Sequence, residues 1–159
     1  MPSLVTLTAA SGVLTSSGVF TNTQTVVVGG KTYTTQTSLT NVDGNVLIGA
    51  SAAATLQNLY DAINLSGTAG TQYATAMTKN TEVEATGVTA TTLTVTAKTP
   101  GSVGNLIAST ETQTNAAWGA AVLESGAGTV SDWATSAMAN SQMNSEVINL
   151  FRGLTAVAE

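Results

Sequence analysis

Apolar and hydroxyl-bearing residues alternate along the first part of the chain, which is the pattern of half-buried β-strands. Residues 4–14 alternate loosely between aliphatic and hydroxyl types and predict a strand or a strand-like N-terminal arm. Residues 25–35 place β-branched and aromatic side chains on both sides of Gly29 and Gly30. Because two glycines can both take the positive φ of a tight two-residue turn, this segment predicts a β-hairpin.

A second turn signal follows the hairpin. Asp43 and Gly44 stand between Leu39 and an aliphatic run at residues 46–48. Asp and Gly are turn residues for different physical reasons, Asp through its side-chain hydrogen bonds and Gly through its freedom in φ. We therefore expect this turn to return the chain to the same sheet.

One helix is predicted at about residues 51–66. Ser51 stands where a helix N-cap should, and Gly67 follows as a stop signal. Between them, apolar side chains recur at the spacing of one helix face: Leu56, Leu59, Tyr60 and Ile63. Residues 66–80 are rich in Gly, Thr and Ala and show no period, so they predict a loop.

The clearest strand pattern lies at residues 91–98, where aliphatic side chains alternate with Thr and Lys before a Pro-Gly turn at 100–101. Residues 106–108 and 120–123 could supply further strands. Together these elements predict an α+β fold. In that fold, a small and mainly antiparallel β-sheet domain packs on one helix and is followed by a C-terminal helical tail.

A joint of small residues at 125–128 separates the predicted β-rich domain, residues 1–126, from the tail, residues 129–159. In the tail, apolar side chains recur at helical spacing, and Ser and Asn interrupt them near 140–144, which predicts one broken helix or two short ones. Such a stripe docks either on its own domain or on a neighbouring subunit. The candidate partner-interface residues are Trp133, Met138, Val147, Leu150, Phe151 and Leu154.

Composition adds a reason to expect contacts with other chains. Of the 159 residues, 43% are hydrophobic and only 8% are charged, against about 25% charged in typical soluble proteins. A monomer normally stays soluble through a mixed-charge surface, so this chain is expected to give part of its surface to neighbours. The alternative is an ordinary Thr-rich β-protein, since Thr suits the solvent face of a strand.

Charge disfavours two classes of partner. The net charge is -5 with four Lys and Arg residues in total, whereas nucleic-acid binding needs a basic face. An apolar run of about 18 residues and a cationic amphipathic helix are both lacking, so we expect no membrane association. The N-terminal residues show no secretory signal, and we expect synthesis and assembly in a cytoplasm.

The residues available for chemistry are few. The absence of His and Cys excludes histidine-based triads, thiol nucleophiles and most metal sites, and no cofactor is expected. Glu82 and Glu84 would share one face of a strand, as a glycosidase pair could. Exposed charges on a sheet edge are the favoured interpretation, because such charges discourage aggregation between edges.

One segment resembles a calcium loop. Asn41, Asp43 and Asn45 offer alternating oxygen ligands around Gly44. The twelfth position, however, is Ala52 instead of the bidentate Glu that such a loop requires. A plain turn is therefore favoured.

Five segments, taken in order, resemble a known family. They are residues 28–34, 45–53, 56–64, 92–101 and 104–112. The series resembles a small β-rich domain found in virion proteins of tailed bacteriophages and covers approximately residues 8–126. The resemblance implies a component of a phage particle, brings no catalytic residues to carry over, and leaves tail, head and fibre locations open.

These observations together favour a structural protein that is not an enzyme. We expect it to reside in the virion of a tailed bacteriophage, as a homo-oligomer in contact with copies of itself and with other virion structural proteins. A tail or adaptor component is slightly preferred over capsid decoration. The alternative is a glycan- or receptor-binding module in which Trp118 and Tyr73, placed in loops, stack on sugars. A carboxylate-dependent hydrolase is the least favoured function.

Overall fold

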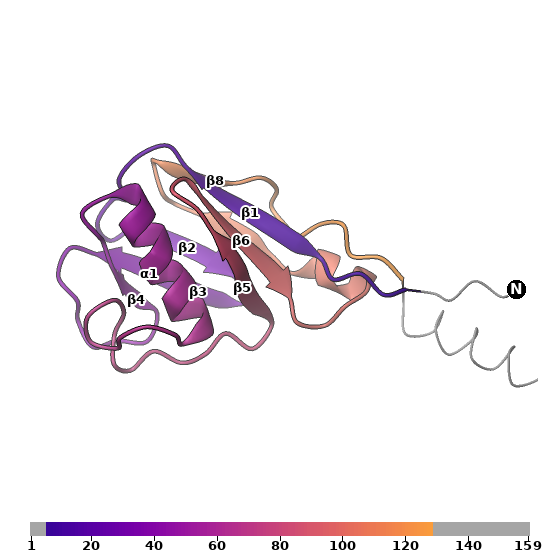
Figure 1. Ribbon diagram of the computed structural model, residues 1–159, viewed down its shortest axis with the longest axis horizontal. Helices are drawn as coiled ribbons and strands as arrows, with labels where there is room; N and C mark the ends of the chain where they lie inside the picture. Colours follow the sequence, from indigo (N-terminus) through magenta and orange to yellow (C-terminus); the bar gives the residue numbers. More distant parts are fainter. Residues whose placement is uncertain (1–5, 129–159) are drawn as a thin grey trace, which may run out of the picture.

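A computed structural model describes residues 6–128, which form two four-stranded sheets and one α-helix (Figure 1). The elements in chain order are β1 Ser11–Ser16, β2 Thr25–Val28, β3 Lys31–Gln36, β4 Asn45–Leu47, α1 Ala52–Asn64, β5 Val83–Val88, β6 Thr92–Ala97, the 3₁₀-helix η1 Ser102–Leu106, β7 Ser109–Glu111 and β8 Ala116–Trp118. The α+β class is confirmed, although the strands form two sheets instead of one.

Each sheet has its own strand order. The first sheet runs β5-β6-β1-β8 and is antiparallel throughout. The second runs β4-β3-β2-β7, and in it β3 and β4 are parallel while the other pairs are antiparallel. Helix α1 packs against β4, β5 and β6, so it closes one side of the space between the sheets. Strands β7 and β8 approach each other on the other side.

The predicted hairpin and the predicted turn are both confirmed. Strands β2 and β3 pair from Val28 opposite Lys31, and the two intervening residues, Gly29 and Gly30, have φ angles of 58° and 66°. Gly44 has a φ of 90° and its carbonyl accepts a hydrogen bond from the Thr34 N–H, so the turn brings β4 back beside β3. Residues 37–44 connect β3 to β4. Parallel neighbours need a longer connection than a tight hairpin turn, because the chain must return to the starting end of the first strand.

Helix α1 begins where the sequence predicts. The Ser51 side chain accepts a hydrogen bond from the Ala54 N–H at 3.2 Å, as an N-cap should. The helix ends at Asn64, before the predicted stop at Gly67, because Leu65 takes a left-handed conformation with φ 52° and its N–H donates to the Asp61 carbonyl. The predicted apolar stripe is confirmed, with Tyr60 only partly buried and the other members fully buried: Leu56, Leu59 and Ile63.

Two predicted strands are misplaced. Leu106 belongs to η1 and is 80% exposed, and residues 120–123 contribute only an isolated bridge between Ala108 and Val122. The strands of this region are β7, which begins just after residues 106–108, and β8, which ends before residues 120–123. The chain turns at Gly101, whose φ is 106°, and this turn leads directly into the 3₁₀ coil instead of an extended strand.

One hydrophobic core fills the space between the sheets and beneath the helix. Strand β6 alternates as predicted, with Leu93, Val95 and Ala97 buried. The largest fully buried side chains are Tyr33, Leu14, Leu56, Leu59, Ile63, Leu93 and Leu123. Backbone hydrogen bonds close the core on the β7–β8 side. The Ser109 N–H donates to the Ala121 carbonyl and the Leu123 N–H donates to the Ile107 carbonyl, both at 2.9 Å.

The two ends of the described chain are joined to each other. Thr8 and Ala127 exchange backbone hydrogen bonds of 3.0 and 3.1 Å, and Ser11 and Glu124 do the same at 2.8 and 2.9 Å. Both ends therefore leave the domain side by side (Figure 1). The predicted joint at residues 125–128 lies at this end of the domain. The division into a β-rich domain and a tail stays a prediction, because the predicted tail, residues 129–159, lies outside the described residues.

Candidate interaction surface

The outer face of the first sheet carries hydroxyl and methyl groups. It consists of the positions that alternate with the buried residues of β1, β6 and β5. Val13 lies opposite Thr94 across the β1–β6 ladder, and Thr15 lies opposite Thr92 on one side and Ala117 on the other. The hydroxyl oxygens of Thr86 and Thr96 are 2.9 Å apart across the next ladder: one donates to the other. The charged member of this face is Glu84, on the edge strand β5.

The outer face of the second sheet has the same character. Its members come from β2, β3 and β7 and include Thr25, Val27, Thr32, Thr34 and Thr110. Thr25 pairs with Thr34, and Val27 lies between Thr32 and Thr110. The branched Cβ atoms of threonine and valine restrict χ1, so each face is a stiff surface of methyl and hydroxyl groups. Immobilising such side chains in an interface costs little entropy.

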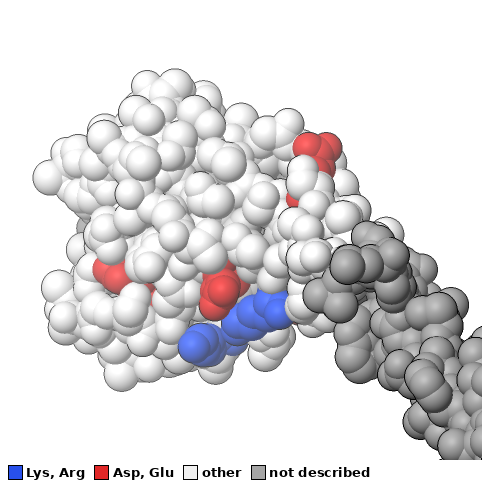
Figure 2. Space-filling model, turned by 45° about the vertical axis from the view of Figure 1, so that its right-hand side comes forward, with Lys and Arg blue, Asp and Glu red and all other residues white. Residues whose placement is uncertain are grey.

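Charged side chains are few on the surface that Figure 2 shows, and basic side chains gather at one margin of it. Several charged groups are also tied to neighbours. Lys31 donates from Nζ to the Asp43 carboxylate at 2.7 Å and also to the Thr78 carbonyl and hydroxyl. The Lys98 ammonium donates to the Asn80 carbonyl. Asp61 is buried on α1 and accepts hydrogen bonds from Ser66, Gln57 and Gln72.

Two ionisable groups in this region, Tyr33 and Asp43, have shifted pKa values. Burial raises the pKa of Tyr33 to about 12, which exceeds the lowering effect of the hydrogen bond from Asn80. Partial burial alone would raise the pKa of Asp43, but hydrogen bonds from Lys31 and Thr78 outweigh it and lower the pKa to about 2. At neutral pH, Tyr33 is therefore neutral and Asp43 is ionised. The ionised Asp43 carboxylate can hold together the segments that carry Lys31, Asp43 and Thr78.

The oxygen-rich turn serves the fold. Asn41 accepts a hydrogen bond from the Ala76 N–H at 2.7 Å, and the Asn45 amide donates to the Thr40 hydroxyl at 2.7 Å. The Asp43 carboxylate is engaged by Lys31 and Thr78, as described above. The plain turn favoured by the sequence is thus confirmed. Within residues 6–128, no group of three or more Asp and Glu side chains is gathered as a metal site would require.

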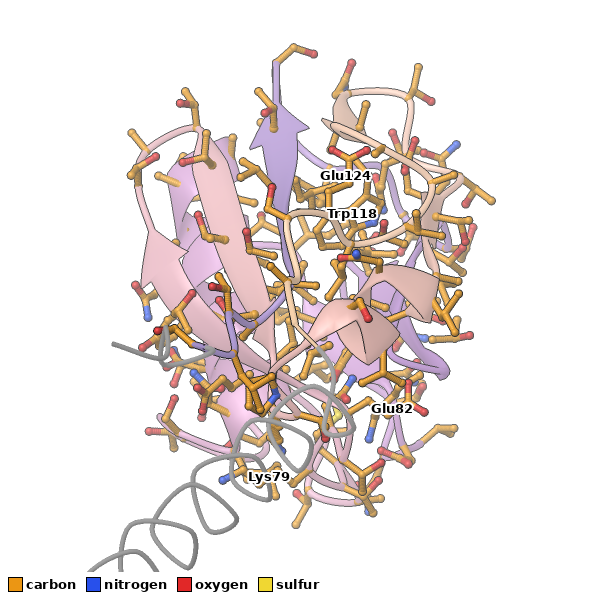
Figure 3. The ribbon with its side chains drawn as sticks, turned by 90° about the vertical axis from the view of Figure 1, so that its right-hand side faces the viewer. Lys79, Glu82, Trp118 and Glu124 are labelled. Carbon is orange, nitrogen blue, oxygen red and sulfur yellow. The ribbon has the colours of Figure 1, made fainter. Side chains whose placement is uncertain are left out.

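Glu82 and Glu84 are both exposed, and Glu84 lies on the edge strand β5, as the favoured interpretation expects. Figure 3 shows Glu82 in the lower part of the domain, away from Trp118 and Glu124 in the upper part. Exposed carboxylates on an edge strand oppose pairing with a second edge. Their arrangement gives no support to the hydrolase hypothesis.

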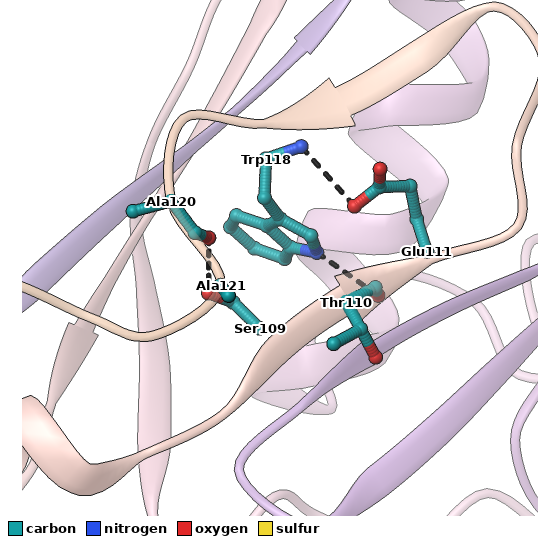
Figure 4. Close-up of a pocket in the computed structure, with 6 residues that line it drawn as sticks. All are labelled: Ser109, Thr110, Glu111, Trp118, Ala120 and Ala121. Atoms are coloured by element: carbon teal, nitrogen blue, oxygen red, sulfur yellow. Dashed lines mark hydrogen bonds between the residues drawn. The ribbon is translucent and has the colours of Figure 1, made fainter.

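The aromatic residues considered for sugar stacking are not in exposed loops, so that expectation is wrong. Tyr73 is 4% exposed and Trp118, on β8, is 9% exposed. The Trp118 indole N–H donates to the Thr110 carbonyl at 3.2 Å, and its backbone N–H donates to the Glu111 carboxylate at 3.2 Å (Figure 4). Trp118 thus fills the gap between β7 and β8 and forms one wall of a hollow of about 330 Å³.

A second surface lies at the end of the domain where the chain ends meet. There, η1 carries Val103 and Leu106, which are 54% and 80% exposed. Figure 3 views this end of the molecule, with η1 between Glu82 and Trp118. Beside η1 is a hollow of about 240 Å³ lined by Thr81, Glu82, Thr99, Val103, Gly104 and Ile107. Sequence reasoning missed this site because it assigned Leu106 to a strand, although the closely spaced Gly101 and Gly104 signal a turn.

Comparisons with known proteins find no match among family models, curated proteins or solved structures. The relation to tailed-phage virion proteins therefore stays a prediction from sequence resemblance. Among residues 6–128, no helix has the length and apolar character needed to cross a membrane.

The partner-interface residues predicted from the sequence lie outside the described residues, so their roles also stay predictions. They are Trp133, Met138, Val147, Leu150, Phe151 and Leu154. The described residues show where the chain leads into this segment. Gly128, the last of them, lies beside η1, since the Ser102 N–H donates to the Gly128 carbonyl at 2.8 Å.

Proposed function

We propose that this chain is a non-catalytic structural protein of a tailed-bacteriophage particle, assembled in many copies through contacts with itself and with other virion proteins. The observation that carries the proposal is the pair of outer sheet faces, which present rigid threonine and valine side chains and almost no charge. A tail or adaptor position is preferred over capsid decoration.

The physical argument concerns desolvation. Burying a charge at an interface costs several kcal/mol unless it is well paired, whereas threonine methyl groups gain from leaving water and their hydroxyls can exchange hydrogen bonds across a contact. The close hydroxyl pair of Thr86 and Thr96 is an example within this chain. Weak contacts of this kind become durable when many copies assemble on a lattice.

The assignment to a phage particle is supported by the ordered resemblance along residues 8–126. It can be tested with an antibody raised against the purified chain. Tailed particles released by the host that carries this sequence are purified by density gradient, then probed by immunoblot and immunogold electron microscopy. We expect many labels per particle, located on the tail or its adaptor. A chain that stays in the soluble fraction and is absent from purified particles would contradict the proposal.

A further inference from the structure

Val103 and Leu106 form an apolar pair on one side of η1. Residues three apart are eclipsed in a 3₁₀-helix, so both side chains project in the same direction. Leu106 is the most exposed of the large hydrophobic residues in the described part of the chain. Exposed apolar groups that stand together mark a contact site more strongly than scattered ones. We name Val103 and Leu106 the η1 pair.

The η1 pair is held by a rigid support. The Gly101 N–H donates to the Thr8 carbonyl at 2.9 Å. The Asn105 amide both donates to and accepts from the backbone of Gly126, at 3.0 and 2.8 Å. Beneath it, a Cβ atom at Gly104 would lie 2.8 Å from the Cβ of Ala10, so the helix sits directly on the domain. Such an arrangement presents the pair without a conformational cost on binding.

Gly128, the last described residue, is hydrogen-bonded to the first residue of η1, Ser102. The Gly128 carbonyl accepts from the first residue of η1, so residues 129–159 continue from a point in contact with this helix. Residues 124–127 run antiparallel to residues 8–11, which enter the domain, so the chain leads outward at Gly128. The described chain therefore ends at the same end of the molecule as η1.

We propose that the η1 pair is the docking site for residues 129–159 of a second copy of this chain. Two exposed side chains cannot cover the six apolar residues of that segment. In addition, Val147, Leu150, Phe151 and Leu154 recur at the spacing of a helix that packs on another helix. Two copies that meet at this end bury both segments and both η1 pairs in one reciprocal contact. The inference rests on the proposed function, for which it supplies the self-contact.

Chemical cross-linking tests whether residues 129–159 of a second copy occupy the η1 pair. Because the chain contains no cysteine, Leu106→Cys and Met138→Cys each introduce a single thiol into the full chain. The two variants are mixed and treated with a short bismaleimide. We expect a covalent dimer containing one copy of each. The matched control replaces Leu106→Cys by Val19→Cys, an exposed valine (49%) in the β1–β2 connection, and should give little product.

The strength of the contact is measured by light scattering on the full chain over a range of concentrations. We expect a dimer whose dissociation constant rises about tenfold or more in Leu106→Ser, as burial of a leucine implies. It should change less than about twofold in Val19→Ser. Circular dichroism and thermal unfolding show whether both variants keep the wild-type fold, which is expected because both side chains are exposed.

Three results would overturn the inference. One is a chain that is monomeric at every concentration. Another is a dimer that Leu106→Ser and Val19→Ser weaken equally. The last is a Leu106→Cys/Met138→Cys double variant that cross-links within a single chain at high dilution, which would place the segment on its own domain. A dimer that depends on Leu106 in a protein absent from particles would refute the proposed function alone. Particle incorporation that Leu106→Ser leaves intact, with no dimer, would refute this inference alone.

Discussion

The Nζ atom of Lys31 lies 2.7 Å from the Oδ1 atom of Asp43, and this ion pair joins the start of β3 to the turn before β4. Thr78, from the loop that follows α1, completes the cluster: its backbone N–H and its hydroxyl both donate to the Asp43 carboxylate, at 2.8 and 2.7 Å. Three segments that are distant in sequence are thus tied to one carboxylate.

This cluster predicts how stability depends on acid. The pKa of Asp43 falls from its ordinary 3.8 to about 2 in the folded protein, because hydrogen bonds from Lys31 and Thr78 outweigh partial burial. The stabilisation is therefore fully present above about pH 4 and is lost as pH falls through 2. Since the Asp43 side chain is 46% exposed, we expect a contribution of no more than about 1 kcal/mol.

The measurement is urea unfolding of the wild type and Asp43→Asn between pH 5 and pH 2. The variant should be less stable at pH 5, and the difference should shrink toward pH 2. Glu84→Gln, at an exposed position on β5, is the matched control and should not reproduce this convergence. A difference between wild type and Asp43→Asn that stays constant over the whole range would refute the prediction.

Asn80 predicts a larger loss of stability. Its side chain is 1% exposed, donates to the Val28 carbonyl and the Tyr33 hydroxyl, and accepts from the N–H groups of Glu82 and Val83. Asn80→Ala leaves several buried polar groups without a partner, so we expect a loss of about 2–4 kcal/mol. Chemical denaturation measures it.

The control for Asn80 is an exposed asparagine. Asn22→Ala removes an acceptor for the Thr37 N–H on the surface, where water can replace it, and should cost less than about 1 kcal/mol. Equal effects of Asn80→Ala and Asn22→Ala would show that burial does not set the importance of Asn80.

The outer sheet faces predict sensitivity to added charge. Thr15→Lys and Thr32→Lys each place one ammonium group on a face of one sheet, at positions where the side chain already points to solvent. The fold should persist, whereas assembly should weaken because the new charge must be desolvated in any contact. Sedimentation of the assembled full chain gives the comparison. Thr71→Lys, exposed in the loop after α1, controls for charge alone, and equal loss in all three variants would contradict a specific role of the faces.

Removal of residues 129–159 separates folding from assembly. The described domain closes on itself through the Thr8–Ala127 and Ser11–Glu124 backbone pairs, both of which survive the deletion. We therefore expect a truncated chain with a cooperative thermal transition and the same far-ultraviolet strand signal, but without incorporation into particles. Normal occupancy of the truncated chain in particles would show that the tail is not needed for assembly.

Local signals in the sequence were sufficient for several elements. The Gly29–Gly30 pair specifies the β2–β3 hairpin because glycine takes positive φ angles without steric cost, and the turn needs two in a row. Ser51 specifies the start of α1 through a hydrogen bond that spans three residues. The alternation in β6 specifies its buried face. Each of these features depends on neighbours in the sequence, so the pattern is readable without the fold.

Long-range packing decided the rest. The division into two sheets depends on the pairing of β1 with β8, in which Thr15 meets Ala117, and of β2 with β7, in which Val27 meets Thr110. The burial of Tyr73 and Trp118 and the exposure of Leu106 follow from those pairings, which no local pattern encodes. The sequence by itself determined turns, caps and strand faces, because these are set by adjacent residues. Only the tertiary structure placed the η1 pair beside the chain ends, because that position depends on contacts between Thr8, Gly101 and Gly128.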